Sequence, residues 1–129
     1  MAFQQDAKTI DNLAHYEYAV VIMVLGEFEQ TVLLAILRLR DGAYGVTIRA
    51  EIAKRTGRQI ARGALHTTLD RLEDKGCLAS RMGDPTPQRG GRAKRYYAVT
   101  AAGLKSVTEA QQAFRSLLEG LPIFGASYA

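Results

Sequence analysis

The segment at residues 77–99 constrains the fold of this chain more than any other. Two short runs of residues typical of β-strands, CLASRM at 77–82 and RYYAV at 95–99, lie on either side of the nine-residue stretch GDPTPQRGG. Tyrosine and valine favour strands, whereas clusters of Pro, Gly and Asp mark turns. The pattern predicts a single β-hairpin with a long tip.

Helical periodicity dominates the rest of the chain. Apolar residues recur at helical spacing over residues 25–39 on nearly every side, which predicts a helix central to the core. Two further helices are expected at about residues 44–56 and 61–75, and Thr100 is a good N-cap for a fourth that ends near residue 119. The side chains expected inward in the first three are Leu25, Phe28, Val32, Leu33, Ile36 and Leu37, then Tyr44, Ile48 and Ile52, then Leu65, Leu69 and Leu72.

The order of these elements is that of a winged helix-turn-helix, in which the third helix enters the DNA major groove and the hairpin wing contacts the flanking backbone. The chain is therefore expected to be mainly α with a small β-hairpin. We expect a winged helix-turn-helix DNA-binding domain at residues 25–100, followed by a C-terminal dimerisation helix and tail at 101–129. Residues 1–24 form an N-terminal extension, interpreted either as an extra helix or as a non-native start, since Met23 is an alternative first residue.

Positive charge is concentrated in the middle of the chain. The net charge is only +4, but residues 49–95 hold 12 of the 17 Lys and Arg and 5 of the 13 Asp and Glu, a local excess of +7. Such clustering favours a polyanionic partner, although a solvated basic surface is the alternative.

The outer face of the third helix supplies the first set of candidate DNA-binding residues: Arg62, Gly63, His66 and Thr67. Ala61 occupies the position where a Ser, Thr, Asp or Asn cap is expected. Either the helix boundary lies elsewhere, or the uncapped N–H groups of the first turn receive a DNA phosphate. Arg71 has several acidic neighbours and is expected to form an ion pair within the chain, with a contact to a DNA base as the alternative.

The hairpin tip supplies the second set of candidates. Arg89 and Arg92 are expected to contact the DNA backbone, because Gly90-Gly91 allow a close approach. Lys94 is a third candidate for DNA contact from the wing. For Arg95, pairing with an acidic side chain and contact with DNA both stay open. Tyr96 and Tyr97 point to opposite faces of the hairpin, so one of them should enter the core.

Catalytic, metal and membrane functions find little support. The sequence contains neither a phosphate-binding P-loop nor a dinucleotide-binding glycine motif. His15, His66 and Cys77 are scattered without a metal-ligand spacing, and the one cysteine is expected to be a small buried side chain in a reducing compartment. The longest apolar run, at residues 18–26, is too short to cross a bilayer. We expect that the protein is not an enzyme, that it binds no cofactor and no metal ion, and that it is located in the cytoplasm.

The fourth helix is expected to join two subunits. Its apolar residues approximate a heptad stripe: Leu104, Val107, Phe114, Leu118 and Leu121. The stripe is longer than a small winged domain needs, although packing on the core of the same chain is the alternative. A two-fold dimer would place two third helices on half-sites about one DNA turn apart, which predicts a pseudo-palindromic operator.

Three segments carry a resemblance to a known family. LLAILRLRDGAYGVTI, RGALHTTLDRLEDKGCLASR and RGGRAKRYYAVTAAG, in this order, resemble the PadR-like family of bacterial transcriptional regulators over about residues 25–105. The resemblance implies a homodimeric winged-helix DNA-binding protein, often a repressor, whose C-terminal helix contributes to the dimer. The chain departs from the family pattern at His66, where a tyrosine is usual, and at Thr67, where a proline is frequent.

Residues and resemblance together predict a cytoplasmic repressor that binds double-stranded DNA as a homodimer. Whether an unidentified small-molecule effector relieves the repression stays open. The alternative is a winged-helix module that docks a protein. Salt dependence distinguishes the two, because contacts to phosphates release counterions and make DNA binding steeply salt-dependent.

Overall fold

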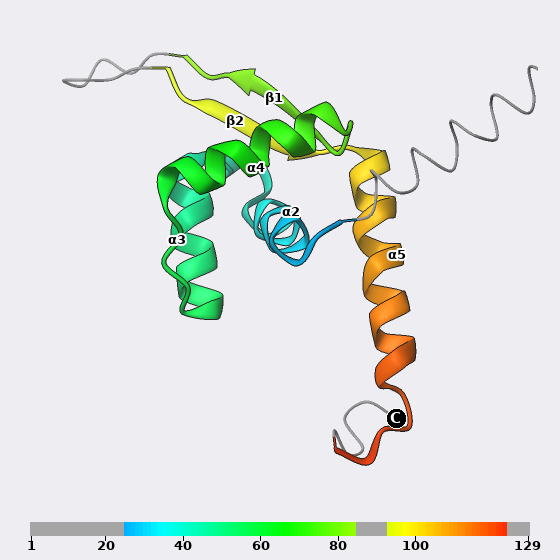
Figure 1. Cartoon of the computed structure of the whole chain (residues 1–129). Coiled ribbons are helices and arrows are strands. Elements are labelled where there is room, and N and C mark those ends of the chain that lie inside the picture. Colours follow the sequence, from blue (N-terminus) through cyan, green and yellow to red (C-terminus); the bar gives the residue numbers. More distant parts are fainter. Residues whose placement is uncertain (1–24, 85–92, 124–129) are drawn as a thin grey trace, which may run out of the picture.

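The computed structural model describes residues 25–84 and 93–123 (Figure 1). The predicted fold class is confirmed, since a mainly helical chain carries a single two-stranded antiparallel hairpin within the described residues. The elements in chain order are α2 (Glu27–Leu39), the 3₁₀ turn η1 (Arg40–Gly42), α3 (Gly45–Thr56), α4 (Arg62–Asp74), β1 (Leu78–Met82), β2 (Arg95–Val99) and α5 (Ala101–Leu118).

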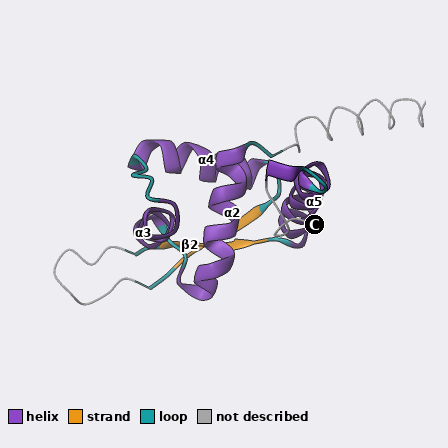
Figure 2. Cartoon of the chain, turned by 90° about the horizontal axis from the view of Figure 1, so that it is seen from below, coloured by secondary structure: helices purple, strands orange, loops and turns teal. Residues whose placement is uncertain are grey.

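Helix α2 occupies the centre of the molecule, as its sequence predicts. It contacts α3, α4, β2 and α5, and Figures 1 and 2 both show it between α3 and α5. Its side chains Val32, Leu33 and Ile36 are almost wholly buried. Leu37, expected in the core, is exposed together with Leu34. The side of α2 that carries these two leucines is only partly covered by α5.

Helices α3 and α4 form the helix-turn-helix. Helix α3 ends at Gly57, whose φ of 76° lies in the left-handed region that glycine adopts without strain. In the turn that follows, the Arg49 Nε donates to the carbonyl oxygen of Ile60 at 2.8 Å. Tyr44, predicted on the apolar side of this helix, instead precedes it as the N-cap residue and is half-buried.

A buried ion pair fixes the C-terminal end of α4. The Lys75 Nζ lies 2.9 and 2.8 Å from the two carboxylate oxygens of Glu29, in the first turn of α2. The Glu29 Oε1 also accepts the N–H of Gly26 at 2.9 Å and so caps α2. One carboxylate therefore joins the beginning of α2 to the end of α4.

The hairpin packs one of its paired tyrosines inward, as the alternation predicts. Strands β1 and β2 are antiparallel, with Leu78 opposite Val99 and Met82 opposite Arg95. Tyr97 is buried in the core, whereas Tyr96 lies half-buried on the other face. Because of burial, the pKa values of Tyr97 and of the Cys77 thiol are raised above their ordinary values.

Helix α5 begins inside the domain and then leaves it. Thr100 caps it as predicted, its Oγ1 accepting the N–H of Gly103 at 3.0 Å. The Val107 side chain is only 2% exposed and fills the core of its own subunit, so it is not available to the second subunit for which the sequence suggested it. The Gln111 Nε2 still donates to the Gln30 Oε1 of α2 at 2.7 Å, and beyond this contact the helix projects away from the other helices (Figure 1). No helix in the described ranges has both the length and the hydropathy to cross a membrane.

Candidate nucleic-acid interface

The outer face of α4 is polar and open, whereas its inner face is fully buried. Leu65, Leu69 and Leu72 are inaccessible to solvent. The four residues suggested for DNA contact all lie on the exposed side: Arg62, Gly63, His66 and Thr67. Helical periodicity produces this division, because burying one leucine stripe turns the remaining positions outward. The structure thus brings the recognition-helix candidates together on one surface.

The first turn of α4 begins without a side-chain cap. Ala61 is the N-cap residue, and no side chain bonds to the N–H groups that follow it. The expected helix start is therefore correct, and the missing cap is not the result of a misplaced boundary. These N–H groups lie at the same end of the helix as Arg62 and Gly63.

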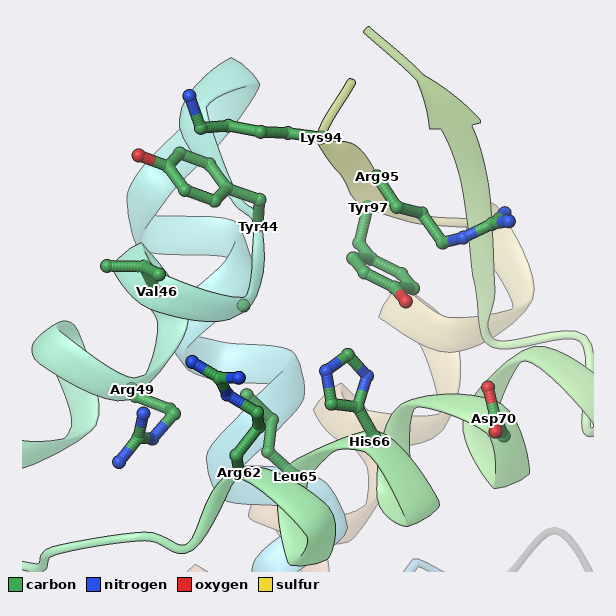
Figure 3. A pocket seen from close by; sticks show the side chains of 11 residues that line it. Tyr44, Val46, Arg49, Arg62, Leu65, His66, Asp70, Lys94, Arg95 and Tyr97 are labelled. Atoms are coloured by element: carbon green, nitrogen blue, oxygen red, sulfur yellow. The ribbon is translucent and has the colours of Figure 1, made fainter. Parts of the chain in front are cut away.

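A cavity of about 320 Å³ lies between the start of α3, the outer side of α4 and the base of the wing (Figure 3). Four cationic side chains line it: Arg49, Arg62, Lys94 and Arg95. Asp70 is the one carboxylate among the lining residues. His66 lies between Arg62 and Asp70 in the view of Figure 3, and the Tyr97 hydroxyl points toward His66. The cavity is therefore basic as well as open to solvent.

The cations around the cavity differ in how firmly they are held. The Arg95 Nη1 donates to the Ser80 Oγ at 3.0 Å, and this hydroxyl donates to the Glu73 carboxylate at 2.7 Å. Arg95 is thus linked to an acid through Ser80, which favours the structural role for it. In contrast, Arg62 forms no ion pair with any residue in the described ranges.

Two further expectations meet the structure differently. Arg71 was expected to pair with a neighbouring acid, but it makes no ion pair with another described residue, and Glu73 instead accepts from Ser80. Arg89 and Arg92, the predicted wing-tip contacts, lie outside the described residues. Lys94 is described, and it lies at the cavity.

Sequence reasoning missed the contribution of α3. Tyr44, Val46 and Arg49 all line the cavity, and the Val46 side chain is exposed beside α4. Their spacing held a signal: Gly45, Val46 and Arg49 lie within about 100° of one another around the helix, at the edge of the buried stripe of Ile48 and Ile52. Only the packing of α3 on α4 shows that this side adjoins the outer face of α4.

Comparison with known proteins agrees with this arrangement. The sequence model described as "Transcriptional regulator PadR-like family" matches residues 33–109, which span the helix-turn-helix, the wing and the first half of α5. This chain belongs to the PadR-like family. The resemblance noted in its sequence is thereby confirmed, and the protein has the winged-helix DNA-binding fold of a transcriptional regulator.

Solved structures of other regulators share the fold of this PadR-like protein. A PadR family transcriptional regulator from Eggerthella lenta DSM 2243 is 25% identical, with a TM-score of 0.58 over 87% of this chain and 91% of that one. A PadR family regulator from Clostridium difficile R20291 is 23% identical, with a TM-score of 0.58 over 70% of this chain and 90% of that one. A structure described as a complex of hsRosR-S4 is 25% identical, also at a TM-score of 0.58, over 71% and 72% of the two chains. Comparison with curated proteins gave no match.

Proposed function

We propose that this PadR-like protein is a homodimeric repressor that binds a pseudo-palindromic operator in duplex DNA and blocks access to a promoter. One observation carries the proposal: the polar outer face of α4 lies exposed beside a cavity lined by four cations and one carboxylate. Duplex DNA is the polyanion that this combination of a protruding helix and surrounding positive charge fits.

The docking geometry follows from the fold family. Helix α4 enters the major groove, where Arg62, His66 and Thr67 reach base edges and Gly63 allows the helix to approach closely. Lys94 and the wing-tip residues Arg89 and Arg92 contact phosphates on the flanking backbone. The uncapped first turn of α4 receives another phosphate, for which its free N–H groups and helix dipole are suited. A small-molecule effector would release the repressor if it bound better to an arrangement in which the two α4 helices no longer match their half-sites.

Exposed apolar side chains on α5 support the proposed homodimer. In the projecting half of this helix and just after it, Phe114, Leu117, Leu121 and Ile123 are exposed, and Leu117 reaches 75%. Leu104 continues the exposed surface toward Leu34 and Leu37 of α2, where a groove runs between the two helices. Leu118, also predicted at the interface, is half-buried. Apolar patches of this kind mark interaction sites, and a second copy of the same surface would bury them.

The dimer is tested by placing a charge on this surface. Leu117→Glu is expected to convert the protein to a monomer with an unchanged circular dichroism spectrum, because the side chain is 75% exposed in the part of the chain that the structure describes. Sedimentation equilibrium measures the change. Ser116→Glu is the matched control, since this exposed neighbour lies about 100° around the same helix from Leu117. If Leu117→Glu remains a dimer, the α5 surface is not the interface.

The DNA-binding role is tested by salt dependence. Log K for a duplex should fall with log salt at about 0.9 per phosphate contact, and Arg92→Ala should reduce this slope by about one. Arg62→Ala should instead change the preference among sequences. Fluorescence anisotropy measures both, with Arg115→Ala on α5 as the control. A flat salt response of the wild-type protein would support the protein-docking module in place of DNA binding.

A further inference from the structure

A stack of two aromatic rings and two cations joins the start of α3 to the base of the wing. The rings of Tyr44 and Tyr96 meet edge to face, with centroids 5.3 Å apart and an interplanar angle of 63°. The Lys94 Nζ lies 5.2 Å from the centre of the Tyr44 ring, and the Arg81 guanidinium carbon lies 4.8 Å from that of Tyr96. Both cation–ring distances are within the range of attractive cation–π contacts.

Backbone hydrogen bonds hold this stack in place. The Tyr97 N–H donates to the Ala43 carbonyl oxygen at 2.9 Å, so β2 is bound to the residue before Tyr44. The Gly83 N–H donates to the Lys94 carbonyl oxygen at 2.7 Å and closes the base of the hairpin. The Tyr96 ring lies so close to Gly83 that a Cβ there would be 2.7 Å from its Cε1. The position of each ring is therefore set by the backbone as well as by its neighbours.

The stack leaves two donors free on the same side. In Figure 3 the Tyr44 hydroxyl and the Lys94 ammonium both point to one side of the cavity rim. Neither group forms a side-chain hydrogen bond with another residue in the described ranges, and Lys94 is absent from their ion pairs. A hydroxyl beside an ammonium is a donor pair suited to a phosphate, because both can bond to the non-bridging oxygens of one group.

We propose that the Tyr44 hydroxyl and the Lys94 ammonium bind the same phosphate of the DNA backbone. This inference rests on the proposed DNA-binding function and assigns to it a residue, Tyr44, that the sequence placed only in the core. The phosphate lies at the junction of α3 and the wing, beside the groove-reading face of α4. The contact fixes how the domain sits on the duplex and carries no base preference. The Tyr96 and Arg81 side chains position the Tyr44 ring and do not touch DNA.

The first test removes the hydroxyl and keeps the ring. Tyr44→Phe should weaken binding to a fluorescein-labelled duplex of arbitrary sequence about tenfold, since it deletes one hydrogen bond to a charged group. The slope of log K against log salt should equal that of the wild-type protein, because no charge is lost. Thr31→Val, which removes an exposed hydroxyl from α2, is the matched control and should bind as the wild type does.

The second test removes the charge. Lys94→Gln should weaken binding several-fold and reduce the salt slope by about one. Lys105→Gln, an exposed lysine on α5, should leave both quantities unchanged. In the double variant Tyr44→Phe/Lys94→Gln the loss should differ from the sum of the single losses in logarithmic units, because both groups bind one phosphate.

The outcomes separate this inference from the proposed function. The Tyr44 assignment would be overturned if the wild-type protein binds DNA with a steep salt dependence and Tyr44→Phe binds it with the same affinity. That result would leave the DNA-binding function intact. Strictly additive losses in the double variant would overturn the shared phosphate. Wild-type binding that does not depend on salt would overturn the DNA-binding function and the inference with it.

Discussion

Replacing Gly103 with alanine is expected to destabilise the protein by about 3 kcal/mol, at the upper end of the usual range for overpacking. A Cβ at this position would lie 2.2 Å from the Cys77 carbonyl oxygen and 3.0 Å from Val99 Cγ1. The carbonyl oxygen cannot turn away without loss, because it accepts the Thr100 N–H at 3.0 Å. The first turn of α5 must therefore move off the hairpin, at the junction that directs the helix out of the domain.

Urea and thermal unfolding measure this effect. The midpoint temperature of Gly103→Ala should fall by roughly 10 °C for such a loss in a chain of this size. Gly63→Ala is the matched control, since that helical glycine has no heavy atom within 4 Å of an added Cβ and alanine has the higher helix propensity. Its stability should equal or slightly exceed that of the wild-type protein. Equal stability of the two variants would show that α5 does not pack against the Cys77 carbonyl group.

Loss of the Lys75 cation is expected to have an effect of similar size. Lys75→Met leaves the Glu29 carboxylate, whose side chain is only 7% exposed, without its partner, and breaking a buried pair in this way costs about 3–5 kcal/mol. The loss of stability should include the C-terminal end of α4, because the ion pair connects it to the first turn of α2. Chemical denaturation measures the free energy of unfolding.

Two further variants show whether the unpaired charge is the cause. Glu29→Gln/Lys75→Met removes both charges and keeps an amide oxygen to accept the Gly26 N–H, so it should recover most of the stability. Arg58→Met breaks the exposed pair with Glu27 and should change the stability by less than about 1 kcal/mol. If Lys75→Met were as mild as Arg58→Met, the buried pair would not contribute as the structure indicates.

The helices and the hairpin were predictable because their signals are local. The leucine stripe of α4 and the Pro- and Gly-rich interruption before β2 specify period and turn within a few residues. Errors arose where burial depends on a distant neighbour. Leu37 and Val107 both fit an apolar stripe, yet the first is exposed and the second is buried, since α5 covers only part of α2. Periodicity identifies an apolar face but not what lies against it.

The candidate site divides in the same way. The outer residues of α4 follow from helical geometry, so Arg62, His66 and Thr67 could be named from their spacing alone. The wing-tip assignments of Arg89 and Arg92 rest on the sequence and stay predictions. Tyr44 and Arg49 could not be assigned to the site, because their neighbours at the cavity from α4 and the wing are 13 to 53 residues away in the chain.

The sequence by itself determined the order of the elements, the polar face of α4 and the cap of α5, because each element depends on residues within a turn or two of one another. It also determined the family, through three segments in a fixed order along the chain. Only the tertiary structure decided that the start of α3, the face of α4 and the base of the wing line one basic cavity. It also decided that Lys75 is buried against Glu29, and that Val107 belongs to its own core while Leu117 faces outward. These features depend on contacts between distant segments, which form only when the helices pack around α2.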